Sequence, residues 1–273
     1  MERPLNRLSY LALATALLAG PATAADFMTP TADAVVVDTA FEDTGDWTGF
    51  SIGVSAGGAF NPQSPGVLEF DQDLDGDFSE PYAPPLSTAF GSNFAGSSEG
   101  GFTGGVSVGY DFQAGDFVFG GIVDVSHVDY TDTQSGFSST PATYTEIREL
   151  NFLATARVRA GFLVTPELLA YVHGGIAGGD VSYSFFGNAG PTTATSRGDS
   201  NSVGFQVGGG LETMVAENIS LGVEYAYTNL GSSDFTTRLT GPAAFNGAVG
   251  VDARGSDRDF DFHTVKGTLK YHF

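Results

Sequence analysis

The chain contains no cysteine, only 11 lysines and arginines against 32 aspartates and glutamates, and no apolar run as long as a membrane-spanning helix. Without cysteine, a disulfide scaffold, a thiolate metal site and the lipid-modified cysteine of a lipoprotein are excluded. A formal net charge of -21 argues against nucleic-acid binding, which needs a basic surface. The hydrophobic fraction of 41% is too high for a disordered acidic chain.

Glycine and aromatic residues are abundant instead, with 38 Gly, 23 Phe and 10 Tyr in 273 residues. Glycine weakens helix interiors, whereas aromatic side chains fit the pleated surface of a sheet. This composition therefore favours many strands over helices.

The N-terminus has the features of an export signal. Arg3 and Arg7 give a basic start, residues 11–20 are apolar, and Ala22-Thr23-Ala24 is a small-residue cleavage motif. We therefore predict a signal peptide over residues 1–24. Residues 25–46 carry acids but no base and no sustained period, which predicts a flexible acidic leader.

From Trp47 onward, bulky apolar residues alternate with small or polar ones, as they do in strands that have one apolar face. The alternation predicts eight strands, over residues 50–60, 102–112, 117–126, 150–162, 168–184, 203–211, 219–227 and 264–273. In the fifth of these, the apolar positions change parity between Ile176 and Val181. A bulge at Gly178-Gly179 would reconcile the two halves.

The connections between these strands alternate in length. Short turns at 113–116, 164–167 and 214–218 alternate with long polar segments at 61–98, 131–144, 185–201 and 230–258. Long loops on one side and short turns on the other are typical of an outer-membrane barrel. We therefore predict an all-β fold, an eight-stranded antiparallel transmembrane β-barrel over residues 47–273. A secreted β-sandwich is the alternative, but it would turn its apolar faces inward.

Charged residues share the polar face of the predicted strands, so they would point into the barrel. They are Asp124, Arg157, Arg159, Glu212, Glu224, Lys266 and Lys270. Side chains nearly fill the interior of an eight-stranded barrel, so these acids and bases are expected to pair. The pattern favours a packed polar plug with a structural or surface-interaction role. The alternative function is a narrow porin-like channel for ions or small solutes.

Several strand sequences resemble a known family. The stretches WTGFSIGVSAG from Trp47, ATARVRAGF from Ala154, AYVHGGIA from Ala170, VGFQVGGGLE from Val203, LGVEYAY from Leu221 and HTVKGTLKYHF from His263 are similar to those of small outer-membrane β-barrel proteins. This porin-like and outer-membrane immunogenic group is related in architecture to the OmpA barrel. The sequence departs from the group at Gly222, where a basic residue is usual, and no peptidoglycan-binding domain is expected after the last strand.

The resemblance implies a place in the outer membrane of a Gram-negative bacterium. Membrane lipids and lipopolysaccharide are then the expected surroundings. The terminal Phe273, at alternate spacing from Tyr271 and Leu269, resembles the signal that the barrel-assembly machinery recognises. No nucleic-acid partner is expected.

One acidic loop matches the first half of a calcium-binding loop. Asp71, Asp73, Asp75 and Asp77 surround Gly76, but Tyr82 stands where the motif has its bidentate glutamate. Calcium is thus the one cofactor considered, and an ordinary acidic surface loop is the alternative.

Catalysis is not expected. Ser126 and His127 are adjacent on a strand and would face opposite sides, and no nucleophile is evident beside His173.

Overall fold

The computed structural model describes residues 46–273, except 140, 189–191 and 199–200. The chain divides into two units, residues 1–41 and 42–273, and only the second is described here. The predicted signal peptide and, apart from Asp46, the predicted acidic leader lie outside the described residues. No helix in the described part is long and apolar enough to cross a membrane.

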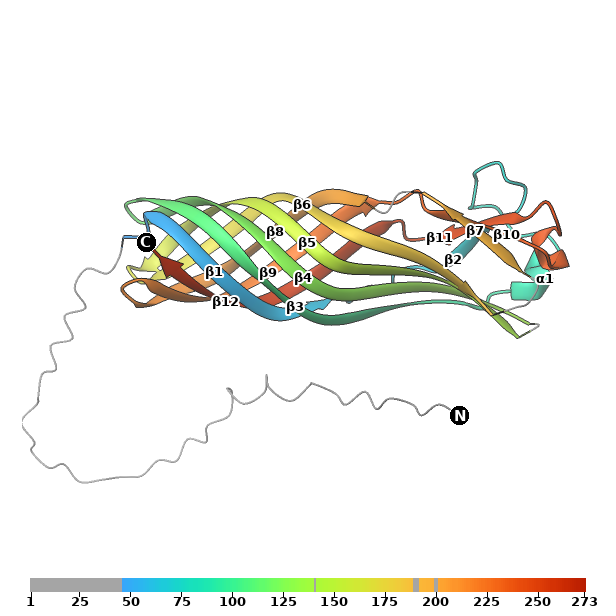
Figure 1. Ribbon diagram of the computed structural model, residues 1–273, viewed down its shortest axis with the longest axis horizontal. Helices are drawn as coiled ribbons and strands as arrows, with labels where there is room; N and C mark the ends of the chain where they lie inside the picture. Colours follow the sequence, from blue (N-terminus) through green and yellow to red (C-terminus); the bar gives the residue numbers. More distant parts are fainter. Residues whose placement is uncertain (1–45, 140, 189–191, 199–200) are drawn as a thin grey trace, which may run out of the picture. The chain divides into compact units, whose positions relative to one another are not determined.

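Eight antiparallel strands close into a barrel in the order β1-β12-β9-β8-β6-β5-β4-β3 (Figure 1). They are β1 (Gly49–Phe60), β3 (Phe94–Ala114), β4 (Phe117–Ser138), β5 (Ala142–Thr165), β6 (Leu168–Gly187), β8 (Asn201–Ala216), β9 (Ile219–Ser232) and β12 (Asp259–His272). The first strand pairs with the last, with Ser51 opposite His272, and this pairing closes the ring. The predicted eight-stranded barrel is confirmed, and each predicted strand overlaps one of these.

The two ends of the barrel differ as predicted. At one end, β3–β4, β5–β6 and β8–β9 are joined by two-residue turns, at 115–116, 166–167 and 217–218. Gly115 takes the positive φ of 61° that its tight turn requires. The C-terminus lies at the same end (Figure 1).

At the other end, a second sheet stands beyond the barrel. Its strands are β2 (Leu68–Asp71), β7 (Thr193–Arg197), β10 (Thr236–Thr240) and β11 (Val251–Gly255), in the order β2-β11-β10-β7. Helix α1 (Leu86–Phe90) and the 3-10 turn η1 (Ala243–Phe245) lie in the same region. We call this sheet, with α1 and η1, the crown. Three of the four long connections supply it.

The fourth long segment, 131–144, is not a loop, and its assignment from sequence was wrong. β4 continues through it as far as Ser138, and β5 begins at Ala142. Their buried side chains here are largely polar, among them Asp132, Gln134 and Glu146. The apolar alternation that marks a lipid-facing strand is therefore absent, although the backbone is still paired.

The outer face of the barrel is apolar. Valines and leucines form its middle, and Val158 is 71% exposed. Aromatic side chains form a band near the short turns, namely Phe50, Tyr110, Phe112, Phe117, Phe119, Phe162, Tyr271 and Phe273. A second band, towards the crown, consists of Phe60, Phe102, Phe152, Phe205 and Tyr225. Two aromatic girdles around an apolar belt are the outer surface of a membrane-spanning barrel.

The interior alternates between apolar and charged layers. Along β4 the inward side chains are Val118 and Ile122, then Asp124 and Ser126, then Val128 and Tyr130, then Asp132. Trp47, Val118, Leu163, Leu169, Tyr171 and Met214 form an apolar cluster near the short turns. A second cluster contains Ala59, Val128, Tyr130, Leu150, Leu153, Ala177, Val181, Leu230, Phe260 and Phe262. A third fills the crown with Leu68, Phe70, Leu86, Phe90, Ala142, Tyr144, Leu239, Phe245, Val251 and Ala253.

The alternation of apolar and charged layers in the interior explains why the sequence of β6 wrongly predicted a bulge. β6 has no register shift at Gly178-Gly179 against either neighbour, so the predicted bulge is wrong. Val172 and Ile176 point outward, whereas Val181 points into the second apolar cluster. Apolar residues change face because the interior itself becomes apolar there. The bulge lies on β5, where Asn151 and Phe152 both point outward.

Candidate functional site in the barrel interior

The first charged layer surrounds Glu212, just above the Trp47 cluster. Arg159 Nη1 lies 2.7 Å from Glu212 Oε2, and Lys270 Nζ lies 2.7 Å from the same oxygen. Arg159 Nε also donates to Asp111 Oδ1 at 2.6 Å. Ser220 Oγ donates to Glu212 Oε1 at 2.7 Å. Two cations and two carboxylates are thus joined in a buried network.

The second charged layer surrounds Arg157. Its guanidinium donates to Asp124 Oδ1 at 2.6 Å and to Glu224 Oε1 at 2.9 Å. Lys266 Nζ lies 3.8 Å from Glu224 Oε1, and His173 Nε2 lies 3.6 Å from Glu224 Oε2. Tyr171 links the layers, because its hydroxyl donates to Glu224 while its ring lies 5.3 Å from the Arg159 guanidinium.

Strand register places these charges. Lys266 on β12 stands directly opposite Glu224 on β9. Arg159 and Asp111 stand on either side of Gly120 in register. A Cβ at Gly120 would lie 1.9 Å from Asp111 Oδ1, so this glycine leaves the space in which the carboxylate meets the guanidinium.

All seven sequence-predicted interior charges lie in these two layers, and each is less than 7% exposed. Asp111 is the fourth carboxylate and is not among the seven charges predicted from the sequence. Its position on the polar face of β3 was a sufficient signal, since it alternates with Ser107 and Gly109. With Asp111 the two layers hold four carboxylates, on Asp111, Asp124, Glu212 and Glu224, and four basic groups, on Arg157, Arg159, Lys266 and Lys270. The interior is balanced in charge, although the chain carries -21.

A further charged pair lies nearer the crown. Arg148 Nη2 contacts Asp132 Oδ2 at 3.1 Å, and both side chains are buried. Sequence reasoning missed this pair because both residues fall in the segments taken to be non-strand.

The predicted calcium loop lies in the crown. Carboxylate oxygens of Asp71, Asp73 and Asp75 lie within 4.8 Å of one another, whereas Asp77 is not in this group. Both oxygens of the buried Asp71 already accept backbone N–H groups, from Leu74 at 2.6 Å and from Gly76 at 2.8 Å. Calcium binding stays a prediction.

Asp77 makes a local turn with Ser79. It accepts hydrogen bonds from the Ser79 hydroxyl and backbone, and these hold the pKa of Asp77 below its usual value. The Asp73 carboxylate, together with Asp75, Asp77 and Asp71, raises the pKa of the exposed Glu80.

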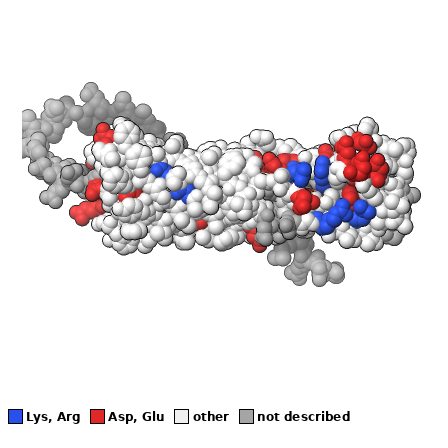
Figure 2. All heavy atoms as spheres, turned by 90° about the horizontal axis from the view of Figure 1, so that it is seen from above, with Lys and Arg blue, Asp and Glu red and all other residues white. Residues whose placement is uncertain are grey.

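Charged residues gather toward both ends of the barrel. Figure 2 shows a mostly white surface along the barrel with a few basic atoms visible, acidic residues at the short-turn end, and groups of acidic and basic residues at the crown end. The basic residues of the crown are themselves paired. Arg197 and Arg238 both contact Asp252, and Arg254 lies 3.7 Å from Glu69.

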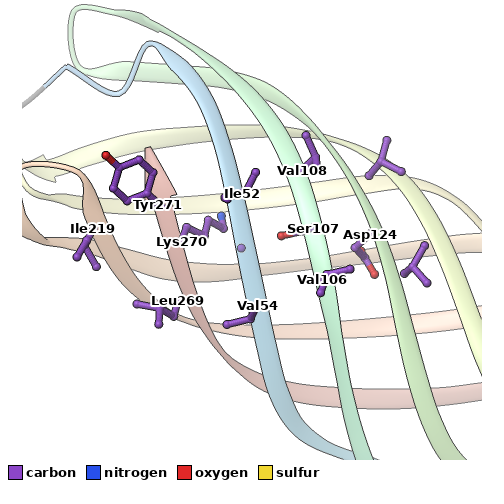
Figure 3. Close-up of a pocket in the computed structure, with 13 residues that line it drawn as sticks. Ile52, Val54, Val106, Ser107, Val108, Asp124, Ile219, Leu269, Lys270 and Tyr271 are labelled. Carbon is purple, nitrogen blue, oxygen red and sulfur yellow. The ribbon is translucent and has the colours of Figure 1, made fainter. Parts of the chain in front are cut away.

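One hollow lies on the outside of the barrel. It is a groove of about 630 Å³ between β1, β3 and β12, with walls that include Ile52, Val54, Val106, Val108 and Leu269 (Figure 3). These side chains belong to the apolar belt, so the groove faces the membrane rather than the interior.

The residues considered for catalysis are separated. Ser126 points inward, where its hydroxyl donates to Asp124 at 3.1 Å. His127 is on the outer face, and its Nδ1 lies 2.9 Å from the Asn151 carbonyl oxygen. His173 belongs to the second charged layer.

A closed ring of strands with an apolar outside and a paired, charged inside defines a transmembrane β-barrel protein. The family model of the outer membrane protein beta-barrel domain matches residues 10–273, and the chain belongs to this family. It is a protein of the bacterial outer membrane. In such barrels the short turns are periplasmic, so the crown is extracellular.

Known proteins similar to the chain come from the same membrane. It is 29% identical over 269 residues to a 31 kDa outer-membrane immunogenic protein of Brucella melitensis, covering 96% of this chain and 98% of the relative. It is 28% identical to a 22 kDa outer membrane protein of Rhizobium leguminosarum, over 60% of this chain and 63% of that protein. Among solved structures, OprG from Pseudomonas aeruginosa is 14% identical with a TM-score of 0.46, over 84% of this chain and 99% of OprG.

Proposed function

We propose that the protein is a closed, non-conducting barrel that carries the crown on the cell surface, with a structural or surface-interaction role. The observation that supports this proposal is the filled interior. Two apolar clusters and two charge-balanced layers succeed one another along the barrel axis. An ion crossing the barrel would have to displace aromatic rings and break buried ion pairs.

The second apolar cluster is the strongest barrier. Tyr130, Phe260 and Phe262 are fully buried, with ring centroids 5.4 to 6.1 Å apart. An ion in such a layer would lose its water without gaining polar partners, which costs far more free energy than thermal motion supplies.

Conductance in planar bilayers tests the proposal. The wild-type barrel, first checked for the mobility shift on boiling that marks a folded barrel, is expected to show no steady unitary currents. A Phe260→Ala/Phe262→Ala variant removes two rings from the barrier and serves as the matched opening variant. Steady currents from the wild type that change with Lys266→Gln would overturn the proposal and support a narrow channel.

The partners we propose follow from the outer surface. Membrane lipid, including lipopolysaccharide in the outer leaflet, would cover the belt between the aromatic girdles. Phe273 is 69% exposed, and its N–H donates to the Phe50 carbonyl oxygen at 2.9 Å. It thus extends the final strand with an exposed aromatic side chain, which would suit recognition by the barrel-assembly machinery. We propose no catalytic activity.

A further inference from the structure

A short link joins the crown to the barrel, between the end of β11 at Gly255 and the start of β12 at Asp259. Two buried side chains of the barrel strands hold it. Gln134 on β4 donates to the Asp257 carbonyl oxygen at 3.0 Å and accepts from the Asp257 N–H at 3.3 Å. Arg148 on β5 donates to the carbonyl oxygens of Asp257 and Asp259, both at 3.0 Å.

Glu146, also on β5, is a third buried side chain at this link. It is 4% exposed and lines a cavity together with Gly255, Asp257 and Arg258. Its Oε2 has no hydrogen-bond partner among the described residues. Glu146 lies six residues from Phe152, which belongs to the aromatic band towards the crown. This separation is about 20 Å along the strand, so Glu146 is outside the membrane.

Glu146 is one of the wall residues of a small cavity at this junction. The cavity has a volume of about 10 Å³, and its walls come from β5, β6, β11 and the segments beside them. Tyr183, another wall residue, has a buried hydroxyl that is also unpartnered. A buried carboxyl oxygen without a partner favours the neutral, protonated form, because ionisation would leave a desolvated charge in the cavity.

We propose that Glu146 is a proton-operated latch: with its carboxyl protonated it holds the crown link on the barrel rim, and the link loosens as the carboxyl ionises. The proposal concerns the crown alone and does not depend on whether the barrel conducts.

The charges around Glu146 come from several elements. Arg148 on β5 is paired with Asp132 on β4, and Arg254 on β11 is paired with Glu69 on β2. Asp257 and Arg258 of the link and Tyr183 of β6 also line the cavity. Arg148 and Arg254 each share their charge with another carboxylate, and Arg258 donates to the Ser233 carbonyl oxygen.

Burial dominates the ionisation of this group. It raises the pKa of Glu146 from 4.5 to about 7, against the opposing effects of Arg148, the Gly255 N–H and Arg254. Burial also raises the pKa values of Asp132, Asp257 and Glu69. A raised pKa in the docked state means that the docked crown binds the proton more tightly than the open crown. Docking is therefore strongest in acid and weakens between pH 4.5 and about 7.

Amide hydrogen exchange of the full-length protein in detergent micelles tests the latch. After correction for intrinsic rates, opening of residues 251–259 is expected to increase by up to about 30-fold from pH 5.5 to pH 8, while barrel amides near Ser220 change little. Glu146→Gln, which cannot ionise, should remove most of this increase. Glu149→Gln, at an exposed position on the same strand, should keep it.

Two results would overturn the latch. One is the same pH dependence in Glu146→Gln as in the wild type. The other is protection of residues 251–259 in the wild type that is constant or rises with pH, and this measurement needs no variant to fold.

Discussion

At the scale of single residues, the interior depends on buried acidic and basic side chains that are paired with one another. Glu212 contacts Arg159 and Lys270, each at 2.7 Å. In Glu212→Gln both cations lose a carboxylate in a buried site, which costs about 3 to 5 kcal/mol. Urea unfolding in lipid vesicles measures this loss, and Glu217→Gln in the exposed β8–β9 turn is the control. Equal stabilities would show that the network contributes nothing.

A glycine makes the second prediction at this scale. A Cβ at Gly120 would lie 1.9 Å from Asp111 Oδ1, whereas at Gly121 the nearest atom would be the Arg157 carbonyl oxygen at 3.9 Å. Gly120→Ala should therefore push Asp111 away from Arg159 and destabilise the barrel by about 1 to 3 kcal/mol. Gly121→Ala should change the stability little, because there is space for a methyl group at this position. The same unfolding measurement compares them, and a larger effect at Gly121 would contradict the assignment of faces.

At the scale of elements, the sequence predicted the strands in which apolar and polar residues alternate. It did not predict the elements whose position depends on which side chains fill the interior. The β1 and β12 strands could be located because their outward side chains meet lipid and their inward ones are small or charged. The parts of β4 and β5 nearest the crown have polar inward side chains, among them Asp132, Gln134 and Glu146. Their inward and outward faces therefore do not differ in this way. The core of the crown forms from Phe70, Phe90 and Phe245, which are distant in sequence, so no local hydrophobic periodicity predicts it.

The same reasoning applies to the candidate site. Lys266 and Glu224 could be assigned to the interior by parity alone, because parity fixes the face. Which charge meets which depends on the register between strands, as for Asp111 and Arg159 across Gly120. Register is set by the closure of the whole ring, so the pairs could not be derived from one strand at a time.

The bulge on β5 gives a prediction at the scale of elements. Asn151 and Phe152 are consecutive outward residues. Because of this extra outward residue, the side chains of both Arg148 and Arg157 point into the barrel. Deleting Asn151 would turn one of these arginines toward the outside, because a one-residue slip exchanges the faces of a strand. We expect loss of the heat-modifiable folded band on gels. Deletion of Ser64, in the exposed segment after β1, should leave that band in place.

At the scale of the whole molecule, the barrel is apolar outside and charged within, and its only tryptophan can report on this arrangement. Trp47 is 1% exposed and its Nε1 donates to the Pro166 carbonyl oxygen at 3.1 Å, inside the periplasmic mouth. In vesicles of lipids with brominated acyl chains, Trp47 fluorescence should be quenched little. In a Trp47→Phe background, Val123→Trp places the indole on the belt, at a position that is 58% exposed, and should be quenched strongly because it contacts the acyl chains. Quenching of Trp47 as strong as that of Val123→Trp would mean that the mouth is open to lipid, and a reversed order would mean that the two faces have been exchanged.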